Sequence, residues 1–146
     1  MSAIEIKFEN GEIAATNTEK SKNLSAILTS GESRAANIIE DALSEIGVSP
    51  TEFCYRRNSQ SYLSVVTHDV YDFLRLKIGQ NTTWFTVFLS PDLRKSLGCD
   101  PRFDAQKNKR QFHWKVELAG VEDLANCKDL IQYGYQSAIW SYEKSK

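Results

Sequence analysis

The segment YDFLRLKIGQNTTWFTVFL, residues 71–89, decides the fold class of this chain. Tyr71–Ile78 alternates apolar and polar side chains with the two-residue period of a half-buried strand. Thr83–Leu89 is almost continuously apolar and rich in β-branched and aromatic residues, which favour strands. Gly79–Asn81 between them is typical of a turn. Two strands joined by so short a turn predict an antiparallel hairpin.

Other strand patterns lie on both sides of this hairpin. Ala3–Phe8 and Glu12–Ala15 flank an Asn-Gly dipeptide, which readily adopts the positive φ angles of a tight hairpin turn. Tyr62–Thr67 contains side chains that suit a pleated surface, and Gln111–Leu118 alternates apolar with polar residues. These patterns predict further strands of an antiparallel sheet.

Two longer segments and one short segment have helical patterns. Apolar residues of Glu32–Ile46 recur at three- and four-residue steps and form one stripe. Ser30 or Ser33 is expected to cap the start of this helix. Val121–Tyr142 has a similar spacing and predicts a long C-terminal helix. Pro91–Leu97 begins with a proline, which favours the first turn of a short helix.

The order of these elements predicts an α+β fold. We expect a single domain over residues 1–146, an antiparallel sheet of about five strands with the two main helices packed on one face. The opposite face of the sheet then stays partly open to solvent. With 146 residues, of which 41% are hydrophobic, the chain is large enough to bury a core of its own.

Composition also bears on the cellular environment. No apolar run of about 18 residues is present, so we expect no transmembrane helix and no membrane partner. The start of the chain lacks the basic and apolar regions of a secretory signal, which predicts a cytoplasmic protein. Cys54, Cys99 and Cys127 are widely spaced, which argues against a disulfide framework, and we expect them to be small buried hydrophobic residues.

Charge is distributed unevenly along the chain. Residues 54–115 carry eleven Lys and Arg against five Asp, a balance of +6. Residues 1–53 sum to −5 and residues 116–146 to −2, which gives the total of −1. Aromatic residues are interspersed in the basic middle segment. Such a segment is typical of surfaces that bind polyanions, and nucleic acid is the partner that we expect.

Two candidate sites for nucleic acid follow from this charge. If the strand alternation holds, six residues project from the open face of the sheet: Phe73, Arg75, Lys77, Trp84, His113 and Lys115. There, aromatic rings can stack on bases while the cations neutralise phosphates. The second site is the loop Gln106–Gln111, in which Lys107, Lys109 and Arg110 can contact phosphates. The alternatives are a core position for the rings and a solvated loop tip for the lysines.

The sequence leaves two other functions open. A protein–protein interaction or regulatory module, using the same sheet face or the acidic N-terminal region, is an equally serious alternative. A metal-dependent nuclease comes third, because Asp104 and Glu117 could converge near Lys115. The order of Lys115 and Glu117 is, however, the reverse of the Glu-x-Lys order of restriction-type nucleases. With two histidines, no C-x-x-C pair and no clustered glycines, we expect no metal site and no cofactor.

Short stretches of the middle segment carry a resemblance to a known family: Ser61–Val65, Asp72–Lys77, Thr83–Phe85, Phe103–Lys109 and His113–Lys115. Through them, Tyr62–Leu118 resembles a small uncharacterised family found in Gram-positive bacteria and their mobile elements. The family has no established activity, so the resemblance implies a bacterial or phage origin. The oligomeric state is left open by the sequence.

Overall fold

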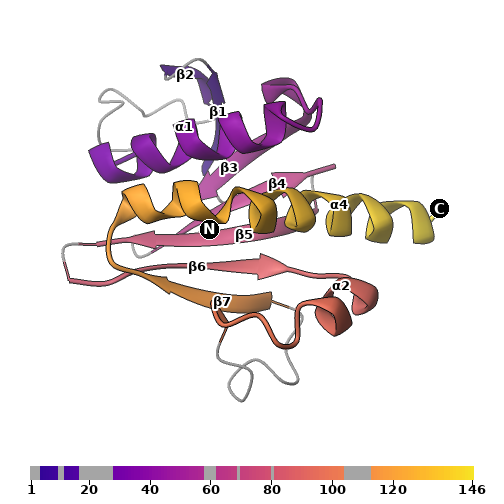
Figure 1. Ribbon diagram of the computed structural model, residues 1–146. Helices are drawn as coiled ribbons and strands as arrows, with labels where there is room; N and C mark the ends of the chain where they lie inside the picture. The colour runs from indigo at the N-terminus through magenta and orange to yellow at the C-terminus, as the bar shows by residue number, and fades with distance from the viewer. Residues whose placement is uncertain are drawn as a thin grey trace.

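The hairpin predicted over residues 71–89 is confirmed, since β5 (Tyr71–Ile78) pairs antiparallel with β6 (Thr83–Phe88). Both strands belong to a computed structural model that describes residues 4–9, 12–16, 28–57, 62–68, 70–79, 81–103 and 113–146 (Figure 1). The Asn-Gly turn, Asp104 and the loop Gln106–Gln111 lie outside the described residues.

The described strands form one antiparallel sheet of seven strands, in the order β2-β1-β3-β4-β5-β6-β7. The other five strands are β1 (Ile4–Glu9), β2 (Glu12–Thr16), β3 (Phe53–Arg57), β4 (Leu63–Thr67) and β7 (His113–Leu118). The predicted α+β class is confirmed, with more strands than expected. β3 was not predicted, because its sequence FCYRR is too short to show a period and ends in two charged residues.

The first long helix, α1, spans Ser30–Ser44, and its N-cap residue precedes both of the predicted caps. Thr29 is the N-cap: its hydroxyl accepts a 3.1 Å hydrogen bond from the backbone N–H of Glu32, whose carboxylate accepts a 2.9 Å bond from the Thr29 N–H. This reciprocal capping box satisfies two backbone donors at once. The assignment of the cap to Ser30 or Ser33 is therefore wrong. Beyond the helix, Gly47 adopts a left-handed φ of +80°, which favours glycine.

The C-terminal helix is shorter than predicted. Val121–Cys127 forms the 3₁₀ helix η3, and the α-helix α4 spans Lys128–Lys144. Val121, Leu124 and Cys127 are the buried residues of η3. Their three-residue spacing matches the three residues per turn of a 3₁₀ helix, which lets one side of η3 face the core. The same spacing also fits an α-helix, which explains why the sequence predicted a single helix that begins at Val121.

Both long helices lie on one face of the sheet, as Figure 1 shows for α1 and α4. At Gly134, the backbone of α4 comes so close to the sheet that an added Cβ would lie 2.7 Å from Cγ2 of Val87. The same Cβ would lie 3.1 Å from the carbonyl oxygen of Phe73. Glycine is thus required in mid-helix for close helix–sheet contact.

A β-bulge in β5 decides which side chains reach each face of the sheet. Val65 pairs with Leu74 but Val66 pairs with Asp72, so Phe73 is an extra residue in the ladder. Phe73 is fully buried, and its ring packs edge-on against Tyr135 of α4 at a centroid distance of 5.5 Å. Because of this extra residue, the side chains that precede it in β5 lie on the opposite face from the one they would occupy in a regular strand.

Two short helices complete the fold: η2 (Pro50–Glu52) precedes β3, and α2 (Pro91–Ser96) follows β6. The start and the proline of α2 agree with the sequence prediction. None of the helices in the described ranges is long and apolar enough to cross a membrane.

Candidate functional site

The sheet face opposite α1 and α4, which we call the open face, carries a line of side chains that crosses five strands. Each strand from β3 to β7 contributes one residue to this line, and strand pairing places the five residues side by side. We call them the basic row: Arg56, Ser64, Arg75, Thr86 and Lys115. Because neighbouring strands lie about 4.8 Å apart, the backbones that carry its three cations follow one another at roughly 10 Å. The three cationic residues are therefore aligned perpendicular to the strands, and Glu5 of β1 is the cross-strand partner of Arg56 at one end of the row.

An aromatic ring lies beside the basic row. A second set of cross-strand neighbours on the open face lies two residues along the strands from the row: Lys77, Trp84 and Glu117. Trp84 is half-buried, and Nζ of Lys115 lies 5.0 Å from its ring centroid. Such a cation–π contact keeps positive charge over the ring. Rings combined with cations are the chemistry that binds single strands of nucleic acid.

Asp72 brings negative charge to the same face. Its Oδ2 accepts a 2.9 Å hydrogen bond from Nε of Arg75, and its Oδ1 lies 3.3 Å from Nε2 of His113. Burial alone would raise the pKa of the Asp72 carboxyl, but the hydrogen bonds from His113 and Arg75 outweigh burial and lower this pKa. Arg75 still exposes 42% of its side chain. The arginine is thus oriented by Asp72 and remains accessible.

The structure brings most of the predicted sheet residues together. Five of them lie on the open face: Arg75, Lys77, Trp84, His113 and Lys115. The prediction for Phe73 is wrong, because the bulge turns its ring into the core. The loop residues Lys107, Lys109 and Arg110 lie outside the described ranges.

Arg56 is a residue of the open face that was not predicted as part of the site. Its neighbour Arg57 points to the opposite face, where it forms an ion pair with the buried Glu32 of α1. Alternation along β3 therefore divides the Arg-Arg pair between the two faces. The signal that could have revealed Arg56 is this dipeptide, but only if β3 had been recognised as a strand.

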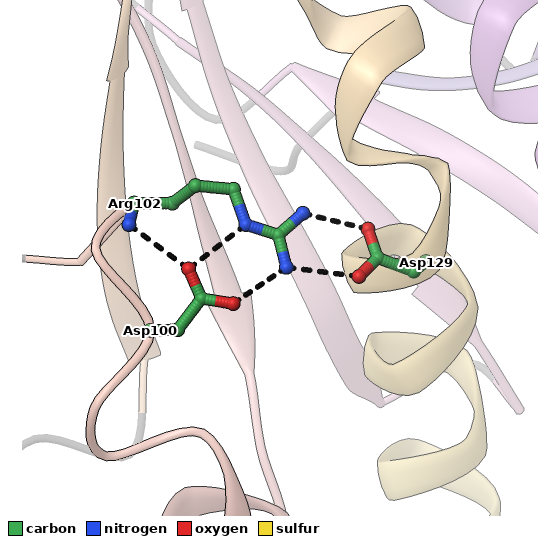
Figure 2. Close-up of polar contacts among 3 residues, drawn as sticks. All are labelled: Asp100, Arg102 and Asp129. Carbon is green, nitrogen blue, oxygen red and sulfur yellow. Dashed lines mark hydrogen bonds and ion pairs between the residues drawn. The ribbon is translucent and has the colours of Figure 1, made fainter.

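Arg102, one of the cations of the basic middle segment, is engaged elsewhere (Figure 2). Its guanidinium donates two hydrogen bonds to Asp129, of 2.7 and 2.9 Å, and two to Asp100, of 3.0 and 2.6 Å. These bonds lower the pKa of both carboxyls and raise the pKa of Arg102. The cluster joins the segment after α2 to the start of α4, and its charge is not available to a polyanion.

A hollow of about 330 Å³ lies at the end of the sheet where β3 begins and β4 ends. Among its lining residues are Cys54 and Val66, which pair across β3 and β4 on the open face. Lys7 lines it too, and its Nζ donates hydrogen bonds to the carbonyl oxygens of Phe53 (2.9 Å) and Thr51 (3.4 Å).

His68 forms part of the rim of this hollow. Its backbone has a left-handed φ of 50°, a conformation that few non-glycine residues adopt. Its ring stacks on Tyr142 of α4 at a centroid distance of 3.8 Å and an interplanar angle of 4°. The residue is nevertheless exposed. One face of the imidazole is thus held by Tyr142.

Neither a metal-binding cluster nor the suggested nuclease pair is seen among the residues that the structure describes. No group of three His, Cys, Asp or Glu side chains among them could hold a metal ion. Glu117 lies 4.0 Å from Lys115, while the other carboxylate of the suggested nuclease site, Asp104, is not described. Cys54 and Cys127 are buried as predicted, but the prediction for Cys99 is wrong because this thiol is exposed.

Comparisons of the chain with protein-family models, with curated proteins and with solved structures find no match.

Proposed function

We propose that this protein is a non-enzymatic binding module that contacts nucleic acid through its open face. The observation that carries the proposal is the alignment of Arg56, Arg75 and Lys115 in one row, with Trp84 beside it. These residues come from four strands, so the fold gathers cations that are far apart in the sequence. A row of this kind complements the repeated charge of a phosphate backbone.

We expect two kinds of contact, ionic contacts with phosphates and stacking contacts with a base. The cations contact phosphates, which gives affinity without sequence information. A base that stacks on Trp84 adds about 1–3 kcal/mol, a typical value for base–aromatic stacking. Stacking requires an accessible base, which favours a single strand over a duplex.

The test is a charge-reversal experiment with a matched control. The variant with Arg75→Glu, Lys77→Glu and Lys115→Glu is expected to lose retention on single-stranded DNA at low salt. A control with Arg34→Glu, Lys128→Glu and Lys144→Glu has the same net charge, but its changes lie on α1 and α4. The control is expected to keep most of the binding. Equal loss in both variants would reject the open face as the binding surface.

A second candidate function is a protein–protein interaction module of bacterial or phage origin, the origin that the family resemblance implies. Asp72 and Glu117 favour it, because they place negative charges among the cations of the open face. Mixed charge of this kind can set the register of a protein interface. This function would be supported instead if the chain did not bind DNA at low salt and captured one protein partner. The triple reversal should then abolish that capture.

A further inference from the structure

The hollow adjoins the basic row at the end of the sheet. Cys54 and Val66 line it from the open face, and Phe53 and Tyr135 line it from the face that α4 covers. Cys54 is two residues from Arg56 on β3, and Val66 is two residues from Ser64 on β4. Two residues along a strand correspond to about 7 Å. A strand of nucleic acid that follows the basic row therefore passes the mouth of the hollow within the reach of one nucleotide.

The polar groups of the hollow have both signs and unused hydrogen-bonding capacity. The ammonium of Lys7 has three donors, of which two are directed to the carbonyls of Thr51 and Phe53. The Glu52 carboxylate accepts a 2.6 Å bond from the N–H of Ser49 through Oε2, and a carboxylate can accept several more. Among the residues that the structure describes, one donor of Lys7 and at least one acceptor position of Glu52 have no partner, and these can serve a ligand.

This combination disfavours a phosphate and favours a nucleobase. A phosphate placed between these walls would meet the negative charge of Glu52, whereas a base has donors and acceptors along one edge. Cys54 and Val66, both nearly buried, contribute apolar surface. His68 contributes a ring whose first face is held by Tyr142 and whose side chain is still exposed. Bases commonly stack on such imidazole rings.

We propose that the hollow binds one nucleobase of a single strand lying along the basic row, with the base stacked on His68 and its polar edge facing Lys7 and Glu52. This inference rests on the proposed function. It assigns two kinds of contact to two places: phosphates to the row, and one base, separated from its neighbours in the strand, to the hollow.

The experiment uses the full chain and a labelled single-stranded deoxycytidine oligomer, compared with an oligomer of equal length that lacks bases. His68→Asn removes the ring while keeping a residue that tolerates positive φ. We expect His68→Asn to weaken binding of the normal oligomer roughly ten- to hundredfold, with an unchanged salt slope, and to leave binding of the abasic oligomer unchanged. Lys7→Met is expected to act in the same direction, and thermal unfolding verifies that both variants fold.

The outcomes separate this inference from the proposed function. Equal weakening on both oligomers, or no weakening by His68→Asn, would overturn the base site while leaving the open face intact. Failure of the parent chain to bind either oligomer would reject the proposed function itself. The chain could instead bind deoxycytidine monophosphate in a manner that depends on His68 and fail to bind the oligomer. That result would show that the hollow takes a free nucleotide, and it would overturn the proposal that the base belongs to a strand.

Discussion

Nε of Arg75 donates a 2.9 Å hydrogen bond to Oδ2 of Asp72, although residues three apart on a regular strand point to opposite faces. The bulge at Phe73 makes this pairing possible, because the extra residue brings Asp72 to the open face. The same shift buries the ring of Phe73. One irregularity in β5 thus exchanges an aromatic side chain for a carboxylate on the candidate binding surface.

Removing that carboxylate should strengthen nucleic-acid binding. Asp72→Asn deletes a negative charge that contacts both Arg75 and His113, so we expect severalfold higher affinity for single-stranded DNA at low salt. Fluorescence anisotropy measures the change. Asp41→Asn, on the exposed side of α1, removes the same charge and should have a much smaller effect. An effect of Asp72→Asn no larger than that of Asp41→Asn would contradict the placement of the site.

Trp84 should contribute to affinity through stacking. Trp84→Leu is expected to weaken binding of single-stranded DNA about tenfold, which is within the range for loss of one stacked base. Trp140→Leu is a matched control, because Trp140 lies on α4, is 39% exposed and also has a lysine, Lys144, over its ring. Equal effects of the two substitutions in a binding titration would argue against a specific role of Trp84.

Gly134 should be essential for packing α4 on the sheet. Gly134→Ala places Cβ 2.7 Å from Val87 and 3.1 Å from a backbone oxygen that cannot easily move. We expect the free energy of unfolding to fall by about 1–3 kcal/mol, a typical cost of overpacking. Gly98→Ala, whose Cβ would lie 3.5 Å from its nearest neighbour, serves as the control. Denaturant unfolding of both variants measures the difference, and a neutral Gly134→Ala would be inconsistent with this packing.

The cluster around Arg102 should contribute to stability above the acid range. The pKa values of Asp100 and Asp129 are lowered from the ordinary value of 3.8 by hydrogen bonds from Arg102. A lowered carboxyl pKa means that the stabilisation is complete above pH 3.8 and is lost as pH falls through the lowered values.

Arg102→Met is therefore expected to reduce the free energy of unfolding by about 1 kcal/mol at neutral pH, because it leaves the mostly buried Asp100 carboxylate without its partner, whereas water can hydrate the 45% exposed Asp129. The difference from the parent chain should shrink as pH falls below 3.8. Urea unfolding at several pH values measures both effects. A difference that is the same at pH 7 and at pH 3 would show that packing, rather than charge, is lost.

The sequence predicted those helices and strands whose apolar periodicity lies within a single segment. The central hairpin, the apolar stripe of α1 and the alternation of β7 all follow from periodicity within one segment. The bulge at Phe73 could not be predicted in this way, because the register of β5 against β4 depends on a partner strand. Arg56 was missed for a related reason: only its pairing with Ser64 shows that it extends the basic row.

The most direct test of the account is the salt dependence of affinity for single-stranded DNA. If Arg56, Arg75, Lys77 and Lys115 each contact a phosphate, the logarithm of the association constant should fall with the logarithm of salt concentration with a slope of about −3. The triple reversal of Arg75, Lys77 and Lys115 should abolish most of this slope. A slope near zero in the parent chain, or an equal slope after the reversal, would contradict binding through the open face.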